Sequence, residues 1–97
     1  MRKVLVFTGS RANYSSTRSV MRAVMEHREL SLQTVVAGAA LLDRYGNIES
    51  LMGDDGIRID AKFHMIVEGE APPTMAKSTG LGIIDMSMIL DNLRPDI

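Results

Sequence analysis

The residues best suited to chemistry in this chain lie in one short loop near its start. Residues 8–12 read Thr-Gly-Ser-Arg-Ala and follow an apolar run directly. The glycine lets the backbone approach a ligand closely, the hydroxyls can donate hydrogen bonds, and Arg11 can hold a phosphate bidentately. A helix that starts here would add free N–H groups and the positive end of its dipole. The loop therefore fits phosphate recognition, and it fits equally an ordinary strand-to-helix turn with a solvated arginine.

Other candidate residues give weaker signals. The loop matches neither G-x-G-x-x-G nor a Walker loop, which disfavours nicotinamide dinucleotides and P-loop phosphoryl transfer. His64 follows an apolar segment near the same expected edge, where a histidine more often anchors a loop than catalyses a reaction. No Ser-His-Asp set and no metal cluster can be assembled. We therefore predict no catalytic residue and no metal site within the chain.

Composition narrows the class of protein. The 97 residues carry a net charge of −1, so no long-range field attracts nucleic acid or an anionic membrane. The absence of cysteine excludes disulfides, zinc thiolate sites and thiol catalysis. The apolar run at residues 4–7 is too short for a signal peptide or a membrane span. We expect a cytoplasmic protein that binds neither nucleic acid nor membrane.

Hydrophobic periodicity predicts the elements that would position the loop. Strands are predicted over residues 3–8, 30–37 and 57–66, and helices over residues 15–27, 48–52 and 73–94. Asn13 or Ser15 is expected to cap the first helix. The apolar side expected for the last helix comprises Met75, Thr79, Ile83, Met86, Leu90 and Leu93. The alternating order predicts a parallel three-layer α/β sheet that binds ligands beyond the carboxyl ends of its strands.

Several short motifs occur in an order that resembles one enzyme family. They are Thr8-Gly9-Ser10-Arg11-Ala12-Asn13-Tyr14-Ser15, Tyr45-Gly46-Asn47, Asp54-Asp55-Gly56-Ile57, residues 64–70, Ser78-Thr79-Gly80-Leu81 and Leu93-Arg94-Pro95-Asp96-Ile97. Each is weak alone, but together they resemble the hydrolysing UDP-N-acetylglucosamine 2-epimerases. The similarity is to the sialic acid pathway type, including the epimerase half of the bifunctional epimerase/kinase.

The resemblance implies the first part of a two-domain fold like glycosyltransferase type B. It implies a UDP-sugar substrate, elimination of UDP through a glycal, and addition of water to release N-acetylmannosamine, with no metal and no other cofactor. Arg11 and Ser15 match family positions that contact UDP, and Gly9, Ser10 and His64 are secondary candidates. The catalytic residues would lie beyond Ile97, in a parent enzyme expected to be a homo-oligomer.

The chain ends where a long helix has finished and a fourth strand is expected to begin. We therefore expect residues 1–97 to form an incomplete N-terminal Rossmann-like domain, inactive by itself, with the second domain absent. A strand order of 3-2-1-4 would leave the first strand on an open edge. The isolated chain is expected to fold poorly or to self-associate.

Three positions depart from the family pattern. Asn13 stands where an acidic residue is usual, Ala40 where a histidine is common, and Ile48 where the family has threonine. Asn13 keeps the capacity to cap a helix. The change at Ala40 removes a side chain expected near the cleft, and so bears on activity or on substrate.

Four alternatives remain open. A non-hydrolysing 2-epimerase is disfavoured by Ser10 and Ala12, because that loop typically reads Gly-Thr-Arg-Pro-Glu. A 2-epimerase acting on a diacetamido UDP-sugar fits these residues as well. The other two are a non-enzymatic module that binds a nucleotide sugar or phosphate, and a remnant without activity.

Overall fold

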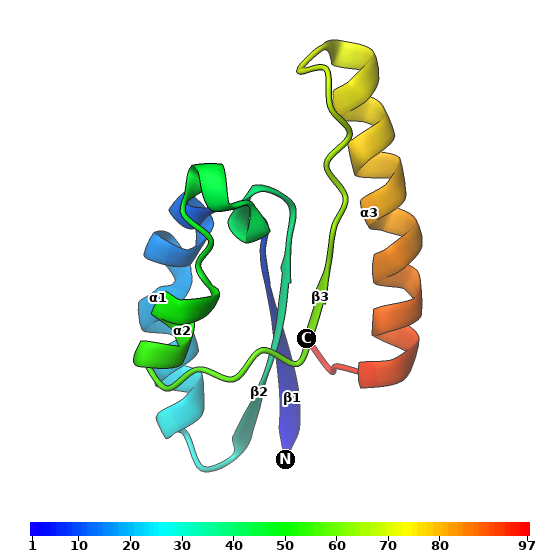
Figure 1. Cartoon of the computed structure of the whole chain (residues 1–97). Helices are drawn as coiled ribbons and strands as arrows, with labels where there is room; N and C mark the ends of the chain where they lie inside the picture. The colour runs from blue at the N-terminus through cyan, green and yellow to red at the C-terminus, as the bar shows by residue number, and fades with distance from the viewer.

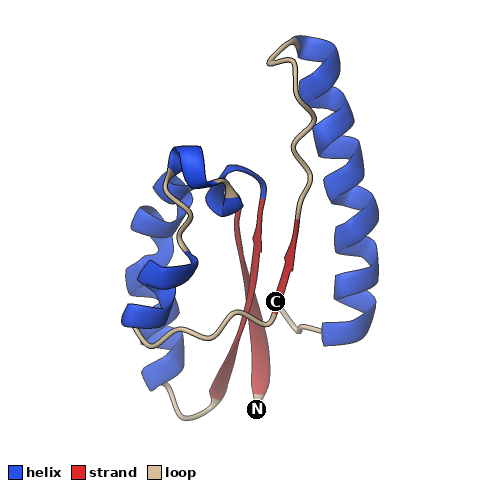
Figure 2. Cartoon of the chain, in the orientation of Figure 1, coloured by secondary structure: helices blue, strands red, loops and turns tan.

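The computed structural model describes all 97 residues and places a parallel sheet between two helical layers (Figures 1 and 2). The strands are β1 (Arg2–Thr8), β2 (Leu30–Ala37) and β3 (Ala61–Phe63), and the α-helices are α1 (Arg11–Glu26), α2 (Glu49–Asp54) and α3 (Pro72–Leu93). Two 3-10 helices, η1 (Gly38–Leu41) and η2 (Asp43–Tyr45), follow β2. Helices α1 and α2 cover one face of the sheet and α3 covers the other, which confirms the predicted α/β fold.

The strands pair in the order β1-β2-β3, all parallel. The pairing runs from Arg2 opposite Leu30 to Thr8 opposite Val36, and β3 joins β2 only at its end, with Phe63 opposite Ala37. The three carboxyl ends therefore share one edge of the sheet. The loops that follow the strands gather at that edge.

Strand β3 is shorter than predicted because side chains take over its expected hydrogen bonds. The Asp60 carboxylate accepts the Thr34 N–H at 2.8 Å, and the Thr34 hydroxyl donates to the carbonyl of Arg58. Before residue 61 the Asp60 N–H still donates to the Thr34 carbonyl at 3.0 Å, but the Thr34 N–H bonds to a side chain and so the regular ladder starts only at Ala61. After Phe63 the ladder stops because β2 has ended, and Gly38 turns the chain away with a φ of +65°.

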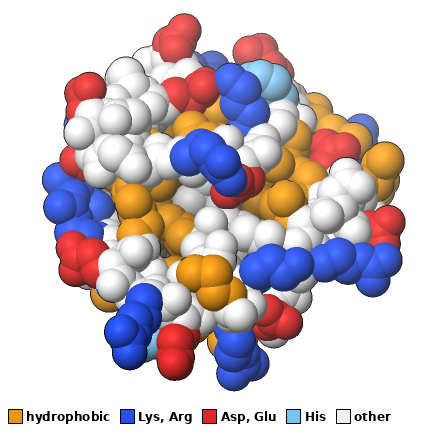
Figure 3. Space-filling view, turned by 90° about the horizontal axis from the view of Figure 1, so that it is seen from below, with side chains coloured by type: hydrophobic (Ala, Val, Ile, Leu, Met, Phe, Trp, Pro, Cys, Tyr) orange, Lys and Arg blue, Asp and Glu red, His pale blue; other side chains and the backbone are white.

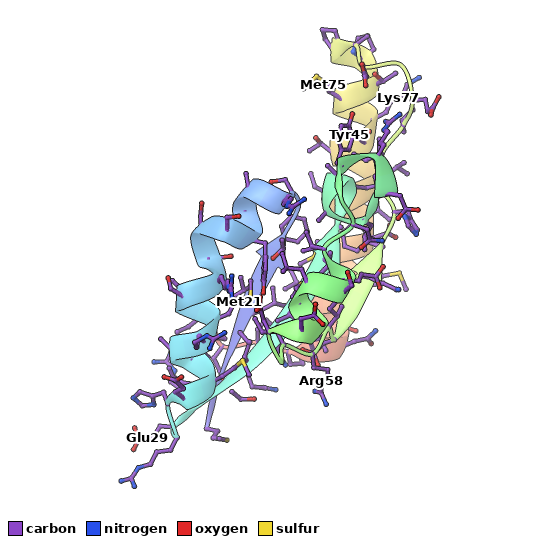
Figure 4. The ribbon with its side chains drawn as sticks, turned by 60° about the vertical axis from the view of Figure 1, so that its left-hand side comes forward. Met21, Glu29, Tyr45, Arg58, Met75 and Lys77 are labelled. Carbon is purple, nitrogen blue, oxygen red and sulfur yellow. The ribbon has the colours of Figure 1, made fainter.

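The closed core lies between the sheet and the α1–α2 layer. Met21 is fully buried beneath α1 (Figure 4) and Tyr14 is 1% exposed. Their partners in the cluster are Val36, Ala40, Leu41, Ile48, Met52 and Ile57. Seen from the amino ends of the strands, apolar side chains show between the elements and charged ones surround them (Figure 3). The core is therefore small, and other apolar side chains remain uncovered at the amino ends of the strands.

Helix α3 makes its closest contact with the sheet through small residues, and the apolar side predicted for it is only partly covered. Ser78 and Gly82 are its buried residues, and a Cβ on Gly82 would lie 2.8 Å from the Met65 methyl group. Of the side predicted from periodicity, Met75, Ile83 and Leu90 are 65%, 66% and 43% exposed. That side is therefore only partly covered: Thr79, Ile83, Met86 and Leu90 line an open groove together with Phe7 and Phe63 of the sheet. No helix of the chain combines the length and the apolar character needed to cross a membrane.

The C-terminal residues return to the free edge of β1. The Ile97 N–H donates to the Lys3 carbonyl at 3.1 Å, and the Leu5 N–H donates to the Ile97 carbonyl at 2.8 Å. The Lys3 N–H also donates to the Asp96 carboxylate at 2.7 Å. This alternation is that of a parallel ladder in which Ile97 lies opposite Val4.

A buried hydroxyl ties α1 to the end of α2. The Tyr14 hydroxyl donates to the Asp55 carboxylate, which also pairs with Arg18 at 2.8 Å. Burial of the phenol, together with its hydrogen bond to Asp55, raises the pKa of Tyr14 from 10.0 to about 12. The folded state therefore favours the neutral phenol. Its contribution to stability is complete below pH 10 and is lost as the pH rises through about 12.

Replacement of Tyr14 by Phe should lower the free energy of unfolding by about 1 kcal/mol at neutral pH, the net value of one hydrogen bond. The variant should also lose less stability than the parent chain between neutral pH and about pH 11, because it lacks the phenol that titrates. Urea denaturation at both pH values measures the two effects. Tyr45→Phe is the matched control, since Tyr45 is 48% exposed. Equal effects of the two substitutions would contradict the assignment.

Candidate functional site

The loop after β1 is fixed by two hydrogen bonds between side chains and backbone N–H groups. The Ser10 hydroxyl accepts the Asn13 N–H at 3.1 Å, and the Asn13 side-chain oxygen accepts the Gly9 N–H at 3.2 Å. Ser10 is therefore the cap of α1, and the prediction of Asn13 or Ser15 was wrong. An amide oxygen at residue 13 is sufficient for this geometry. The N–H groups of Arg11 and Ala12, at the first two helical positions, have no intrahelical acceptor.

Arg11 is exposed and takes part in none of the chain's ion pairs. Its guanidinium lies over Gly46, where a Cβ would come within 2.7 Å of Nη1. Gly46 also has a φ of +75°, which favours glycine. Because Gly46 has no side chain, the turn after η2 leaves room for the Arg11 side chain at the carboxyl edge of the sheet.

Ser15 lies one helical turn after Arg11, on the same side of α1. Its hydroxyl donates to the Arg11 carbonyl at 3.2 Å and is exposed to solvent. The hydroxyl can still accept a hydrogen bond, or it can turn away from the backbone to donate one. The structure thus brings together Gly9, Ser10, Arg11 and Ser15.

His64 lies apart from this group. It directly follows β3 and is exposed, two strands away from β1, or roughly 10 Å across the sheet. It lies close enough to Glu49 of α2 to contribute to the electrostatics of that carboxylate, which pairs with Lys62 at 2.7 Å. The pKa of Glu49 is lowered mainly by that bond and by one from Asn47, and only slightly by His64. His64 therefore lies near Glu49 of α2 and not beside the Arg11 loop.

A groove of about 370 Å³ opens at the carboxyl edge between η2 and the arm formed by residues 65–79. Figure 4 shows Tyr45 beside the N-terminal half of α3. The Arg44 guanidinium lies 5.0 Å from the centre of the Tyr45 ring and 4.0 Å from the Glu68 carboxylate. The Tyr45 hydroxyl donates to Glu70 at 3.4 Å.

Sequence reasoning did not single out Arg44 or Tyr45 as site residues. Tyr45 lines the groove, and the Arg11 guanidinium lies directly against its neighbour Gly46. One turn thus connects the groove to the arginine. The Tyr45-Gly46-Asn47 motif was the available signal for Tyr45, whereas nothing in the sequence marked Arg44.

Two of the unusual residues lie in the core, away from the groove. Ala40 is fully buried and Ile48 is 1% exposed. The interpretation that Ala40 removes a side chain from the cleft was therefore wrong, because a larger residue there would enter the core. Ala39, one position earlier, is the residue that lines the groove. No three His, Cys, Asp or Glu side chains come together to hold a metal ion.

Comparison with known proteins gives distant similarities that extend over the whole of this chain. No family model matches the chain. Across all 97 residues it is 25% identical to the UDP-N,N'-diacetylbacillosamine 2-epimerase (hydrolyzing) of Legionella pneumophila and 24% identical to the UDP-N-acetylglucosamine 2-epimerase of Neisseria meningitidis serogroup B. The chain spans 26% and 25% of these two proteins. Together with the parallel α/β sheet, these matches support a relationship between the chain and the UDP-sugar 2-epimerases.

Proposed function

We propose that this chain forms part of the nucleotide-facing wall of a hydrolysing UDP-N-acetylglucosamine 2-epimerase. One observation carries the proposal: Arg11 holds an unpaired guanidinium over Gly46, beside the start of α1 and at the carboxyl edge of the sheet. Such an edge is where open α/β sheets bind ligands. The chain that carries this group is similar along its whole length to two UDP-sugar 2-epimerases.

The proposed role of the loop is to receive the diphosphate of a UDP-sugar. The Arg11 guanidinium supplies a planar pair of donors, and the free N–H groups of Arg11 and Ala12 add partial positive charge. As UDP leaves the sugar, negative charge grows on the departing diphosphate, and donors fixed in advance stabilise that charge. Ser15 would add one hydrogen bond from the same side of α1. The groups that move protons lie outside these residues.

We further propose that the domain continues with a fourth strand along β1. The ladder between Ile97 and β1 already has the direction and register of such a strand. Beyond it lies an open apolar groove of about 480 Å³, lined by Phe7, Phe63, Met65, Ile83, Met86 and Leu90 among others. An apolar strand at this edge would cover the groove. We propose a second domain opposite the site, and a cytoplasmic enzyme without metal or nicotinamide.

A second candidate substrate is a diacetamido UDP-sugar, because the Legionella relative is a 2-epimerase of that kind. The two substrates share UDP, so the Arg11 loop would serve both. They differ in the sugar, which these residues are not proposed to contact. A non-enzymatic module that binds a nucleotide sugar is the alternative if the reading frame encodes no further domain.

The protein encoded by the complete reading frame should release UDP and N-acetylmannosamine from UDP-N-acetylglucosamine, with a chelator present and no nicotinamide added. A coupled UDP assay measures the reaction, and the diacetamido UDP-sugar in parallel identifies the preferred substrate. UDP release that chelation abolishes would disprove the metal-free mechanism. No UDP release from either sugar would leave only a binding function.

Arg11→Ala should weaken UDP binding by about 1.5–3 kcal/mol, the range for a charge-assisted hydrogen bond. Arg11→Lys should recover only part of the loss, since an ammonium is a point charge without a planar fork. Calorimetry with UDP measures both. Arg22→Ala removes the same charge from an exposed position later on α1 and should have little effect. Equal losses at both positions would show that net charge alone attracts UDP.

Gly46→Ala should weaken UDP binding by displacing the Arg11 guanidinium, which lies 2.7 Å from the new Cβ. It should also cost about 1 kcal/mol of stability, because alanine is strained at positive φ. Gly56→Ala is a matched control: its φ of +76° is nearly identical, but a Cβ there meets no atom within 4 Å. Both variants should lose similar stability by thermal unfolding, and only Gly46→Ala should lose UDP affinity. A loss of affinity in both would assign the effect to strain.

A further inference from the structure

The groove between η2 and the arm of residues 65–79 lies directly beside the Arg11 loop. Tyr45 lines the groove and directly precedes Gly46, against which the Arg11 guanidinium lies. Ala39 lines another wall of the groove, at the start of the loop that follows β2 and passes against the loop that follows β1. A chemical group joined to a phosphate at Arg11 can therefore reach this groove.

The groove has the size and the mixed lining of a small-molecule site. Its volume of about 370 Å³ falls within the range of ligand pockets, roughly 300–1,000 Å³. The lining combines two carboxylates and a phenol, those of Glu68, Glu70 and Tyr45, with apolar side chains. The apolar residues besides Tyr45 are Ala39, Met65, Ile66, Val67 and Met75.

The side chains of the groove offer mainly hydrogen-bond acceptors. The Glu68 and Glu70 carboxylates accept hydrogen bonds and donate none. The Thr74 and Thr79 hydroxyls already donate to backbone carbonyls, at 2.8 and 3.1 Å. Two carboxylates also repel a phosphate. The groove therefore fits an uncharged group with several donors, and the hydroxyl groups of a sugar are donors of this kind.

The uracil ring of a nucleotide fits this lining less well. It presents two carbonyl acceptors and only one N–H donor, so most of its polar atoms would face carboxylates without a hydrogen bond. The Arg44 guanidinium also lies over the Tyr45 ring, 5.0 Å from its centre, where a base would otherwise stack. The groove thus favours the sugar of a UDP-sugar over its base.

We propose that the groove holds the sugar, and that Glu70 and Glu68 accept hydrogen bonds from its hydroxyl groups. The inference rests on the proposed function, because the diphosphate at Arg11 is what brings the sugar to the groove. Both carboxylates are free to turn toward a ligand, since their present contacts are long. The Tyr45 hydroxyl lies 3.4 Å from Glu70, and the Arg44 guanidinium lies 4.0 Å from Glu68.

The two carboxylates also determine which sugar is preferred. In the diacetamido sugar an acetamido group takes the place of one hydroxyl of N-acetylglucosamine. That group brings a carbonyl acceptor, which cannot bond to a carboxylate and is repelled by it. The Arg11 loop serves the UDP of either substrate, whereas Glu70 and Glu68 select the sugar with more hydroxyl groups. The preferred substrate is therefore UDP-N-acetylglucosamine.

Glu70→Gln in the protein encoded by the complete reading frame tests the proposal. The measurement for each UDP-sugar is kcat/KM, or the dissociation constant by calorimetry if the sugar is not turned over. The variant should lose about tenfold or more with UDP-N-acetylglucosamine, the effect of one charge-assisted hydrogen bond, and less with the diacetamido sugar. Its affinity for UDP alone should stay within about twofold of the parent. Glu26→Gln, the same change at an exposed residue at the end of α1, should affect none of these values.

Equal losses for UDP and for the UDP-sugar in Glu70→Gln would overturn the proposal, because the carboxylate would then face the nucleoside or support the fold. Unchanged values for both sugars would overturn it as well, and so would a parent protein that prefers the diacetamido sugar. Arg11→Ala separates this inference from the proposed function. If Arg11→Ala weakens UDP binding and Glu70→Gln has no selective effect on the sugar, only the inference about the groove fails. If Arg11→Ala leaves UDP binding unchanged, the proposed diphosphate site fails.

Discussion

The site depends on the close approach of two loops at the carboxyl edge of the sheet. Because β1 and β2 are parallel neighbours, the loops that follow them must leave the sheet side by side. The Gly9 carbonyl accepts the Ala40 N–H at 3.3 Å, and a Cβ on Gly38 would lie 3.1 Å from that same oxygen. Gly38 therefore lets the second loop pass against the first. The path of the second loop then brings Gly46 beneath Arg11.

The two faces of the sheet differ in how fully they are covered. On the α1–α2 face, apolar residues from five elements close over one another, and the buried Tyr14 hydroxyl, Asp55 and the half-exposed Arg18 link α1 to the end of α2. On the α3 face the helix buries only Ser78 and Gly82, and a groove stays open toward β1. The loop that carries Arg11 belongs to the covered face. The Arg11 loop can thus be held in place by the covered face even though the groove on the α3 face stays open.

The sequence could predict what local patterns determine, and much less of what depends on tertiary contacts. Periodicity located α1, α3 and the first two strands, and the alternating order determined the sheet. It offered Asn13 or Ser15 as the cap and missed Ser10, because serine and asparagine both cap helices and only the path of the chain decides. It could not foresee that the Asp60 side chain would replace part of β3. Nor could it tell that Ala40 is a core residue, or that Gly46 and Arg11, 35 positions apart, are in contact.

The electrostatics of the carboxyl edge explain how a chain of net charge −1 could bind an anion at the proposed site. Long-range attraction is absent, so affinity must come from groups in direct contact with the ligand. Arg44 faces Glu68 and Lys62 is held by Glu49, so both of these charges are already balanced. Arg11 has no such partner, and the unpaired N–H groups at the start of α1 lie beside it. A bound anion would therefore displace no carboxylate from Arg11, and its full charge remains available to the ligand. Because the site is exposed, salt should weaken that attraction even though the overall charge is small.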